Sequence, residues 1–474
     1  MVDEVKIIEQ CQVSPPQGSL PSSINLPLSH LDLGWFYCPL KQIYCYNFPH
    51  STQHFLQTSL PILKSSLSLT LQHFFPYCSK SILPPKPHTP HILYTQGDSI
   101  SLTICESNSN FNNLISNSPK HLTIADPFLP LTPPPTILQD GTLVFPVMAI
   151  QITIFPNFGF TICLNTRHEV GDGKSFHHFL SFWSSLSKGN LQISFLPLPF
   201  HKREIIQDPK GLKQICLEKL WNPPPKTTQS NNSTNHLISS RNNLVRYGLN
   251  LTRHHLDNLK KWMDIKGQTI GLDMLHLSTF VATCSLLWVC MVKLKSQEKK
   301  NITDDSIEDE VTNNCPPEND MEDNYGFGFL MDMRGRFELS IPSTYFGNCL
   351  MLCDATLPKR KLVGENGICE AANVIGREIS LSDPLNEVNK IEIKPENLIR
   401  VVDLSKFYVH ENDFGWGNPV LRDVLNMNNS SDFLIMDSKD GDGGIDVGMI
   451  LEKDQVKKFN SIFELQLRDV GVVE

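Results

Sequence analysis

The chain has 474 residues, of which 40% are hydrophobic and 19% are charged, as in an ordinary globular protein. This length exceeds what a single hydrophobic core usually organises, so we expect two domains. The formal net charge of -9 provides no basic surface for a phosphate backbone, which argues against a nucleic-acid partner.

Two further features of the composition bear on where the chain works. Residues 1–16 include early acidic residues and no long apolar run, so they do not resemble a signal peptide. The 13 cysteines include no CxxC pair and no metal-ligand spacing. We therefore expect a cytoplasmic protein with reduced thiols and no bound metal.

The first strongly patterned segment is a predicted strand followed by a predicted helix. FGFTICLNTRH, residues 158–168, precedes KSFHHFLSFWSSL, residues 174–186, whose apolar residues recur at helical spacing. Short strands that alternate with amphipathic helices predict mixed α/β layers.

His168 begins the sequence HEVGD at the end of this predicted strand. Period-two alternation places Phe160, Ile162 and Leu164 on the strand face that ends at this histidine. An imidazole held at a strand end beside a turn is suited to general base catalysis near neutral pH. The alternative is a core histidine whose ring nitrogens are satisfied by hydrogen bonds.

The turn in HEVGD is expected to have structural roles. Gly171 and Gly173 permit a tight turn around Asp172. Ser175 is a candidate cap for the following helix. A carboxylate beside such a turn commonly pins it through an arginine, so we expect Asp172 to pair with Arg334.

His177 and His178 resemble a metal-binding pair when they are considered by sequence alone. Neighbouring residues on a helix point away from each other, and no third ligand is evident. We therefore expect no metal site here.

Two segments without hydrophobic periodicity divide the rest of the chain. Residues 221–243 are rich in proline, asparagine and serine, and we expect a crossover linker at residues 206–243. This predicts an amino-terminal domain at residues 1–205 and a carboxyl-terminal domain at residues 244–474. Residues 296–324 carry many carboxylates and few large apolar side chains, so a solvated, mobile insertion is expected.

The carboxyl-terminal domain has two further predicted elements. Residues 274–292 are uncharged and almost long enough to cross a membrane, but their polar members favour a buried helix. Alternating apolar residues in 443–451 predict a strand, and Val456, Phe459 and Phe463 follow it at helical spacing.

Residues 413–417 read DFGWG, and this motif together with HEVGD resembles the paired signature of the plant BAHD acyl-CoA acyltransferases. Further matches are GDSISLTICES from Gly97, QITIFPNFGF from Gln151, HLSTFVATCSLLW from His276, YFGNC from Tyr345 and GENGICEAANVIG from Gly364. QITIFPNFGF and YFGNC resemble the anthocyanin and flavonoid glycoside branch, whose members use malonyl-CoA or hydroxycinnamoyl-CoA.

The resemblance implies an α/β fold of two domains like chloramphenicol acetyltransferase, with mixed sheets and a solvent channel between them. In such an enzyme His168 deprotonates an acceptor hydroxyl as it attacks the thioester of acyl-CoA. Coenzyme A then leaves, and no covalent acyl-enzyme forms. Acyl-CoA is thus a co-substrate rather than a permanently bound cofactor, and the resemblance implies a monomer.

The resemblance also assigns roles to other motif residues. The indole N–H of Trp416, or a nearby backbone amide, is a candidate donor to the oxyanion. Asp413 could relay a proton, but the family pattern favours a structural role for it in a tight loop with Gly415 and Gly417. Ser278 and Thr279 are candidate coenzyme A contacts, and the alternative for them is ordinary helix capping.

The expected acceptor is a hydroxyl on a flavonoid or other phenolic glycoside, and malonyl is the favoured donor group. A malonyl carboxylate needs a cation, for which Arg167 and Lys174 are near in sequence, whereas a cinnamoyl group needs only an apolar slot. The alternatives are hydroxycinnamoyl or acetyl transfer to a triterpenoid, an alkaloid or an acyl sugar. A non-catalytic member that binds a CoA ester or a metabolite is a further alternative.

Overall fold

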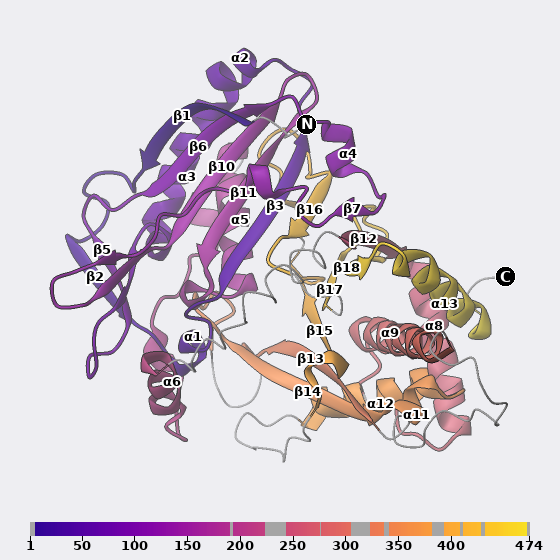
Figure 1. The fold of residues 1–474 in the computed structure, drawn as a ribbon. Helices are drawn as coiled ribbons and strands as arrows, with labels where there is room; N and C mark the ends of the chain where they lie inside the picture. The colour runs from indigo at the N-terminus through magenta and orange to yellow at the C-terminus, as the bar shows by residue number, and fades with distance from the viewer. Residues whose placement is uncertain are drawn as a thin grey trace.

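The computed structural model describes residues 5–189, 193–222, 243–274, 276–304, 323–335, 341–381, 393–407, 411–427 and 432–471. These residues form two halves that lie side by side, each built on a large mixed sheet with helices packed against it (Figure 1). The predicted α/β class with mixed sheets is confirmed.

The amino-terminal half is built on a six-stranded sheet of order β1-β6-β10-β11-β3-β16, in which β6 and β10 are parallel and the other neighbours are antiparallel. Its strands are β1 (Val5–Val13), β3 (Pro39–Asn47), β6 (Ile100–Ser107), β10 (Met148–Phe155), β11 (Gly159–Arg167) and β16 (Leu421–Val424). The helices α3 (Leu60–His73) and α5 (Gly173–Lys188) pack together within the same hydrophobic core.

A smaller five-stranded sheet of order β2-β5-β4-β9-β8 extends this half. Its strands are β2 (Ser23–Pro27), β4 (Lys80–Leu83), β5 (His91–Thr95), β8 (Thr136–Ile137) and β9 (Leu143–Pro146). Four short helices complete the half: α1 (His30–Leu33), α2 (Thr52–His54), α4 (Phe111–Ile115) and α6 (Leu212–Trp221).

The carboxyl-terminal half is built on a seven-stranded sheet of order β14-β13-β15-β17-β18-β12-β7. Its strands are β7 (Lys120–His121), β12 (Leu244–Leu251), β13 (Asn324–Asp332), β14 (Leu350–Pro358), β15 (Leu398–Asp403), β17 (Asp432–Asp437) and β18 (Ile445–Glu452). Its helices are α8 (Arg253–Thr269), α9 (Thr279–Asp304), α11 (Lys359–Val363), α12 (Gly367–Leu381) and α13 (Gln455–Asp469).

Helix α9 is the centre of the carboxyl-terminal core. It packs against α8, α11, α12 and α13, and its residues from Val281 to Val292 are buried. Residues 279–297 are apolar and long enough to cross a membrane, but 72% of this window is buried inside the protein. The uncharged stretch that begins near residue 274 is therefore largely a core helix, as its polar residues predicted.

The two halves exchange strands. β16 comes from the carboxyl-terminal part of the sequence but pairs with β3, where Leu421 lies opposite Cys45. β7 comes from the amino-terminal part but pairs with β12, where His121 lies opposite Val245. Because the exchanged strands donate backbone hydrogen bonds to the other sheet, the halves cannot separate without breaking both ladders.

The structure confirms the strand and helix that surround HEVGD, which are β11 and α5, and the pair near the carboxyl end, which is β18 and α13. The face with Phe160, Ile162 and Leu164 packs in the core with α5, as predicted, and the structure adds what covers the other face. β11 is buried on both faces, because Cys163 packs in a separate cluster with Ile43 and Phe111 on the side away from α5. A central strand covered on both faces has a continuous run of buried residues.

Parts of two predicted segments lie outside the described residues. Within the predicted linker, α6 is helical and contacts α1, whereas residues 223–242 are not described. Within the predicted acidic insertion, α9 continues to Asp304, whereas residues 305–322 are not described.

Candidate active site

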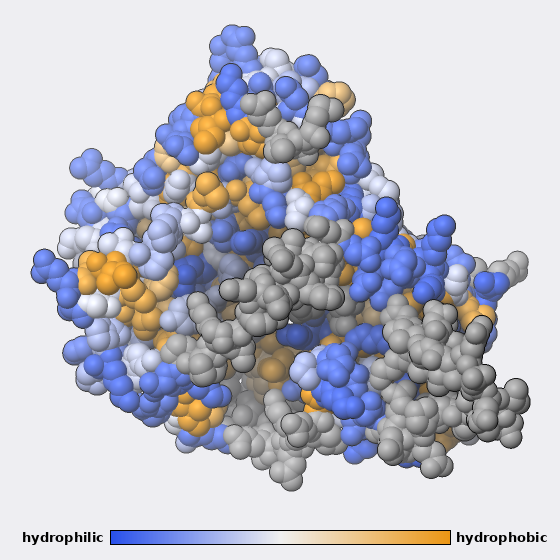
Figure 2. All heavy atoms as spheres, in the orientation of Figure 1, coloured by the Kyte–Doolittle hydropathy of each residue, from blue (hydrophilic) through white to orange (hydrophobic). Residues whose placement is uncertain are grey.

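His168 lies where the two halves meet. It begins a short 3-10 helix, His168–Val170, directly after β11, and its side chain reaches a cavity of about 380 Å³. Residues of both halves line this cavity, including Leu40 and Gly173 from the first and Met331 and Leu404 from the second. The face of the molecule in Figure 2 is hollowed between the two halves.

Asn348 fixes the position and the protonation of the His168 ring. The Asn348 side-chain amide donates to the Asp32 carboxylate at 3.0 Å and to the His168 backbone carbonyl at 2.9 Å. Both of its N–H groups are thereby used, so the Asn348 oxygen faces His168 Nδ1 at 3.1 Å and can only accept. In neutral His168 the proton is therefore on Nδ1, and Nε2 is left as the base.

Asn348 belongs to the YFGNC motif, which the sequence singled out as a resemblance without assigning this residue a role. Asp32, its partner, is fully buried and forms an ion pair with Arg203 at 2.8 Å. No pattern within either segment could show this arrangement, because Asn348 and His168 are 180 residues apart.

The surroundings of the imidazole favour its neutral form. Trp35 stacks on the ring with centroids 4.2 Å apart, and His168 is 9% exposed. Burial lowers the pKa of His168, and this effect outweighs the hydrogen bonds and the Asp172 and Asp32 charges that act to raise it. A buried imidazole at a cavity wall is available as a base at neutral pH, unlike a core histidine with both nitrogens occupied.

The predicted ion pair between Asp172 and Arg334 is present and is bidentate. Arg334 Nη1 lies 2.8 Å from one Asp172 oxygen, and Nη2 lies 3.1 Å from the other. Both side chains are almost fully buried, with exposures of 1% and 0%. Arg334 also donates to the carbonyls of Tyr345 and Gly347, so the pair ties HEVGD in one half to YFGNC in the other.

The cap of α5 differs from the prediction. Asp172, not Ser175, is the N-cap, since its carboxylate accepts from the Ser175 amide at 3.0 Å. The Ser175 hydroxyl instead bonds the backbone N–H and carbonyl of Gly347. The backbone at Gly171 packs closely against Ser175, and a Cβ at residue 171 would lie only 2.9 Å from the Ser175 Cβ.

Asp413 stabilises the DFGWG loop through hydrogen bonds and an ion pair. Its carboxylate accepts from the amides of Gly415 at 2.7 Å and Gly417 at 2.9 Å, and it pairs with Lys188 at 2.6 Å. Gly415 and Gly417 have φ values of 109° and 91°, which favour glycine. Burial acts to raise the pKa of Asp413, but Lys188 and the two amides hold that pKa below its usual value. Asp413 does not line the His168 cavity, so a catalytic role for it is not supported.

Trp416 is too far from His168 to donate to an oxyanion formed there. Its ring packs on Phe160, with centroids 5.6 Å apart, and on Phe48 and Phe55. Phe160 lies near the start of β11, and His168 follows its end, so this 9-residue strand separates them by about 26 Å at about 3.3 Å per residue. The position of Trp416 does not support the predicted oxyanion role, and its aromatic contacts indicate packing.

The two candidate coenzyme A residues differ in position. Ser278 lines the cavity with His168, and its hydroxyl also accepts from the Val281 amide at the start of α9. Thr279 is not among the lining residues, and its hydroxyl accepts from Lys260 at 3.4 Å. The structure thus brings Ser278 to the site but not Thr279.

The two candidate cations for a malonyl group also differ. Arg167 turns away from the cavity, bonds Glu169 and the Phe36 carbonyl, and packs on the Phe145 ring at 4.2 Å. Lys174 lines the cavity, where its ammonium pairs with Asp332 at 2.9 Å. A carboxylate in the cavity would therefore compete with Asp332 for Lys174.

His177 and His178 point to separate partners, as expected of neighbours on a helix. His177 Nε2 accepts from Arg422, and His178 Nε2 donates to the Pro197 carbonyl. Within the described ranges, no group of three or more histidine, cysteine, aspartate or glutamate side chains is placed to hold a metal ion.

Comparison with known proteins identifies the family. A family model described as the Transferase family matches residues 4–466. The chain belongs to the BAHD acyltransferase family. This acyltransferase is 33% identical to coumaroyl-CoA:anthocyanidin 3-O-glucoside-6''-O-coumaroyltransferase 1 of Arabidopsis thaliana, over 97% of each chain. It is 30% identical to malonyl-coenzyme A:anthocyanin 3-O-glucoside-6''-O-malonyltransferase of Dahlia pinnata, over 98% of this chain and 97% of the relative.

Solved structures agree on the fold. The crystal structure of vinorine synthase superposes with a TM-score of 0.65 and 16% sequence identity, over 97% of this chain and 98% of that chain. The two-domain α/β architecture that the resemblance implied is thus also the fold of vinorine synthase.

The Asp172–Arg334 pair makes a testable contribution to stability. Replacement of Arg334 by methionine leaves a buried, unpaired carboxylate, which should lower the free energy of unfolding by about 3–5 kcal/mol. Urea denaturation measures this loss. Lys174→Met is the matched control, because its ion pair is about one-third exposed and should contribute less than about 1 kcal/mol. Equal effects of the two variants would contradict the assignment.

The position of Trp416 predicts a small effect on catalysis. Trp416→Phe keeps an aromatic ring against Phe160 but removes the indole N–H, so kcat should change by less than about threefold. A steady-state acyl-transfer assay measures it. A loss of about 100-fold or more would instead indicate a lost oxyanion donor.

Proposed function

We propose that this acyltransferase moves an acyl group from acyl-CoA to a hydroxyl of a phenolic glycoside, with His168 as the general base. The observation that carries the proposal is the geometry of His168, whose Nδ1 is fixed by Asn348 while the ring lines a cavity between the halves. Relatives that cover the whole chain are named as glucoside acyltransferases, which supports the acceptor class.

His168 Nε2 accepts the proton of the acceptor hydroxyl as the oxygen attacks the thioester carbonyl. A positioned base contributes about 100- to 10,000-fold, and confinement of both substrates in one cavity contributes further. The tetrahedral intermediate then expels coenzyme A and leaves the ester. Gly173 and Lys174 at the amino-terminal end of α5 line the cavity, and the helix dipole there favours the negative charge of the intermediate.

The cavity favours a hydroxycinnamoyl donor over the malonyl donor that the sequence favoured. Its walls are largely apolar and include Leu40, Phe329, Met331, Ile379, Leu404 and Phe407. Lys174 and Arg334 are engaged in ion pairs, Lys406 is a further cation of the lining, and the carboxylates of Asp332 and Asp403 also line the cavity. A malonyl carboxylate would meet these charges, whereas an aromatic group needs only the apolar wall.

A donor and acceptor panel tests the function. Purified protein is incubated with 4-coumaroyl-CoA, malonyl-CoA or acetyl-CoA and with an anthocyanidin 3-O-glucoside or a simple phenolic glucoside. Thiol release and the mass of the product are followed together. We expect coumaroyl transfer to the glucoside, with kcat/KM at least about tenfold above that for malonyl-CoA. Malonyl transfer at equal efficiency would contradict the proposed preference for a hydroxycinnamoyl donor. Thiol release without an acylated product would contradict the proposed glycoside acceptor.

His168→Ala tests the base in the same assay. We expect kcat to fall by about 100- to 10,000-fold, because the hydroxyl loses its proton acceptor. His178→Ala removes an imidazole from the neighbouring helix, outside the cavity, and should change kcat by less than about threefold. Similar activity of the His168 variant and the wild type would refute the mechanism.

The pH profile tests the role of Asn348 as a positioning residue. Since burial lowers the pKa of His168 below 6.5, kcat/KM should persist below pH 6.5 and fall as His168 is protonated. The Asn348 hydrogen bond acts to raise this pKa, so Asn348→Ala should move the acidic limb to lower pH and reduce kcat by about tenfold. Nitrogen-15 NMR of His168 should show one tautomer in the wild type and a mixture in the variant. An unmoved acidic limb and an unchanged tautomer would leave Asn348 with a merely structural role.

A further inference from the structure

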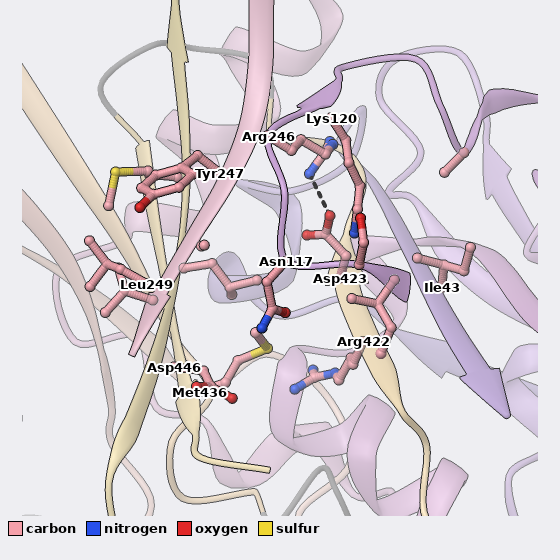
Figure 3. A pocket seen from close by; sticks show the side chains of 18 of the residues that line it. Ile43, Asn117, Lys120, Arg246, Tyr247, Leu249, Arg422, Asp423, Met436 and Asp446 are labelled. Atoms are coloured by element: carbon pink, nitrogen blue, oxygen red, sulfur yellow. Dashed lines mark hydrogen bonds and ion pairs between the residues drawn. The ribbon is translucent and has the colours of Figure 1, made fainter. Parts of the chain in front are cut away.

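A second cavity, also of about 380 Å³, lies between the two halves and does not include His168 among its lining residues. Its walls come from β12, β17 and β18 of the carboxyl-terminal sheet, from β16 of the amino-terminal sheet, and from residues 114–125 (Figure 3). Most of the wall is apolar, and it includes Ile43, Leu249, Val420, Leu425, Met436 and Ile450.

Arg422 lies in the wall of this cavity and points from β16 toward Met436 (Figure 3). Arg422 is 2% exposed. Nε donates to the Tyr44 hydroxyl at 3.2 Å, and Nη2 donates to the Gln42 side-chain oxygen at 3.2 Å and to His177 Nε2. These acceptors are uncharged, and burial lowers the pKa of His177 well below its usual value, so its imidazole is neutral.

The guanidinium has spare capacity for an anion. Nη1 is buried and has no hydrogen-bond partner, and within the described ranges no carboxylate forms an ion pair with Arg422. Asp423, its neighbour, pairs with Arg246 at 3.1 Å, and Asp437 offsets part of the charge from a distance. Burial lowers the pKa of Arg422, but an arginine stays charged at neutral pH.

A buried charge without a counter-charge is unfavourable, and a bound carboxylate would relieve this cost. The other acidic groups of the wall do not fill this role. Asp446 accepts from the Asn250 amide at 2.7 Å and from the Lys439 backbone N–H. The cavity thus combines apolar side chains with the buried guanidinium of Arg422, and Lys120 is a further, partly buried cation of its wall. Apolar walls with a few polar groups are the arrangement expected of a small-molecule site.

We infer that this second cavity binds a small organic carboxylate with an apolar body, whose carboxylate pairs with the Arg422 guanidinium. The apolar body lies against Leu425, Met436 and Ile450. The cavity volume of about 380 Å³ lies within the range of small-molecule sites. This site is separate from the proposed acyl transfer, and its occupancy does not depend on turnover.

Binding of 4-hydroxybenzoate tests the inference, and it is measured by calorimetry with 4-hydroxybenzamide and inorganic phosphate as the comparison ligands. Wild-type protein should bind the acid. Arg422→Gln should weaken binding at least about tenfold, because a charge-assisted hydrogen bond is lost. Lys439→Gln removes a cation from the cavity rim and should leave affinity within about twofold.

A second variant keeps the test valid if Arg422→Gln fails to fold. Gly248→Phe adds a ring at the cavity wall. A Cβ at this position would lie 3.7 Å from its nearest neighbour, which is an ordinary contact. This variant should abolish binding while Arg422 remains in place. Wild-type affinity in both variants, or no binding of the acid to wild type, would overturn the site. If 4-hydroxybenzamide bound as tightly as 4-hydroxybenzoate, the inference that the site recognises a carboxylate charge would be wrong. If phosphate bound equally tightly, the inference that the ligand has an apolar body would be wrong.

Discussion

The buried ion pair between Asp172 and Arg334 is the contact on which the geometry of the active site depends. Its two carboxylate oxygens are fully occupied by Arg334, the Ser175 amide and the Cys349 amide. One side of the pair caps α5, and the other side orders the segment that carries Asn348. The residue that fixes the His168 ring is therefore itself placed by a charge pair across the domain boundary.

The proposed role of His168 as a base relies on this arrangement. His168 is covered by Trp35 and anchored at Nδ1 and at its own carbonyl, so the ring cannot rotate freely. A precise geometry is thus obtained without a carboxylate in direct contact with the imidazole, which would have raised the pKa.

The two interdomain cavities share a polar wall. Gln42 lines the His168 cavity and accepts from Arg422, which lines the second cavity. His177 accepts from Arg422 and stacks on Phe407, with centroids 5.2 Å apart, and Phe407 lines the His168 cavity. One layer of side chains therefore separates the space for acyl transfer from the inferred carboxylate site.

Local patterns predicted β11, α5, β18 and the position of His168 at a strand end, because periodicity and turn residues are properties of neighbouring residues. The pairing of Asp172 with Arg334 was also predictable from charge. Asn348 was missed because its role depends on a contact across 180 residues. The place of Trp416 could not be predicted either, because it depends on which end of β11 the ring covers. The direction of Arg167 was equally hidden, since the turn after β11 decides which side chain enters the cavity.

The exchange of β7 and β16 has a consequence for biosynthesis. β3 remains an edge strand until residues beyond 420 have been made, and the Lys41 amide reaches its acceptor in Asn426 only after 385 further residues. The first half must therefore leave the ribosome with an unpaired edge, which is a hazard for aggregation. Contacts between residues so far apart in sequence slow folding. The six-stranded sheet of the first half is complete only when β16 from the second half has paired with β3.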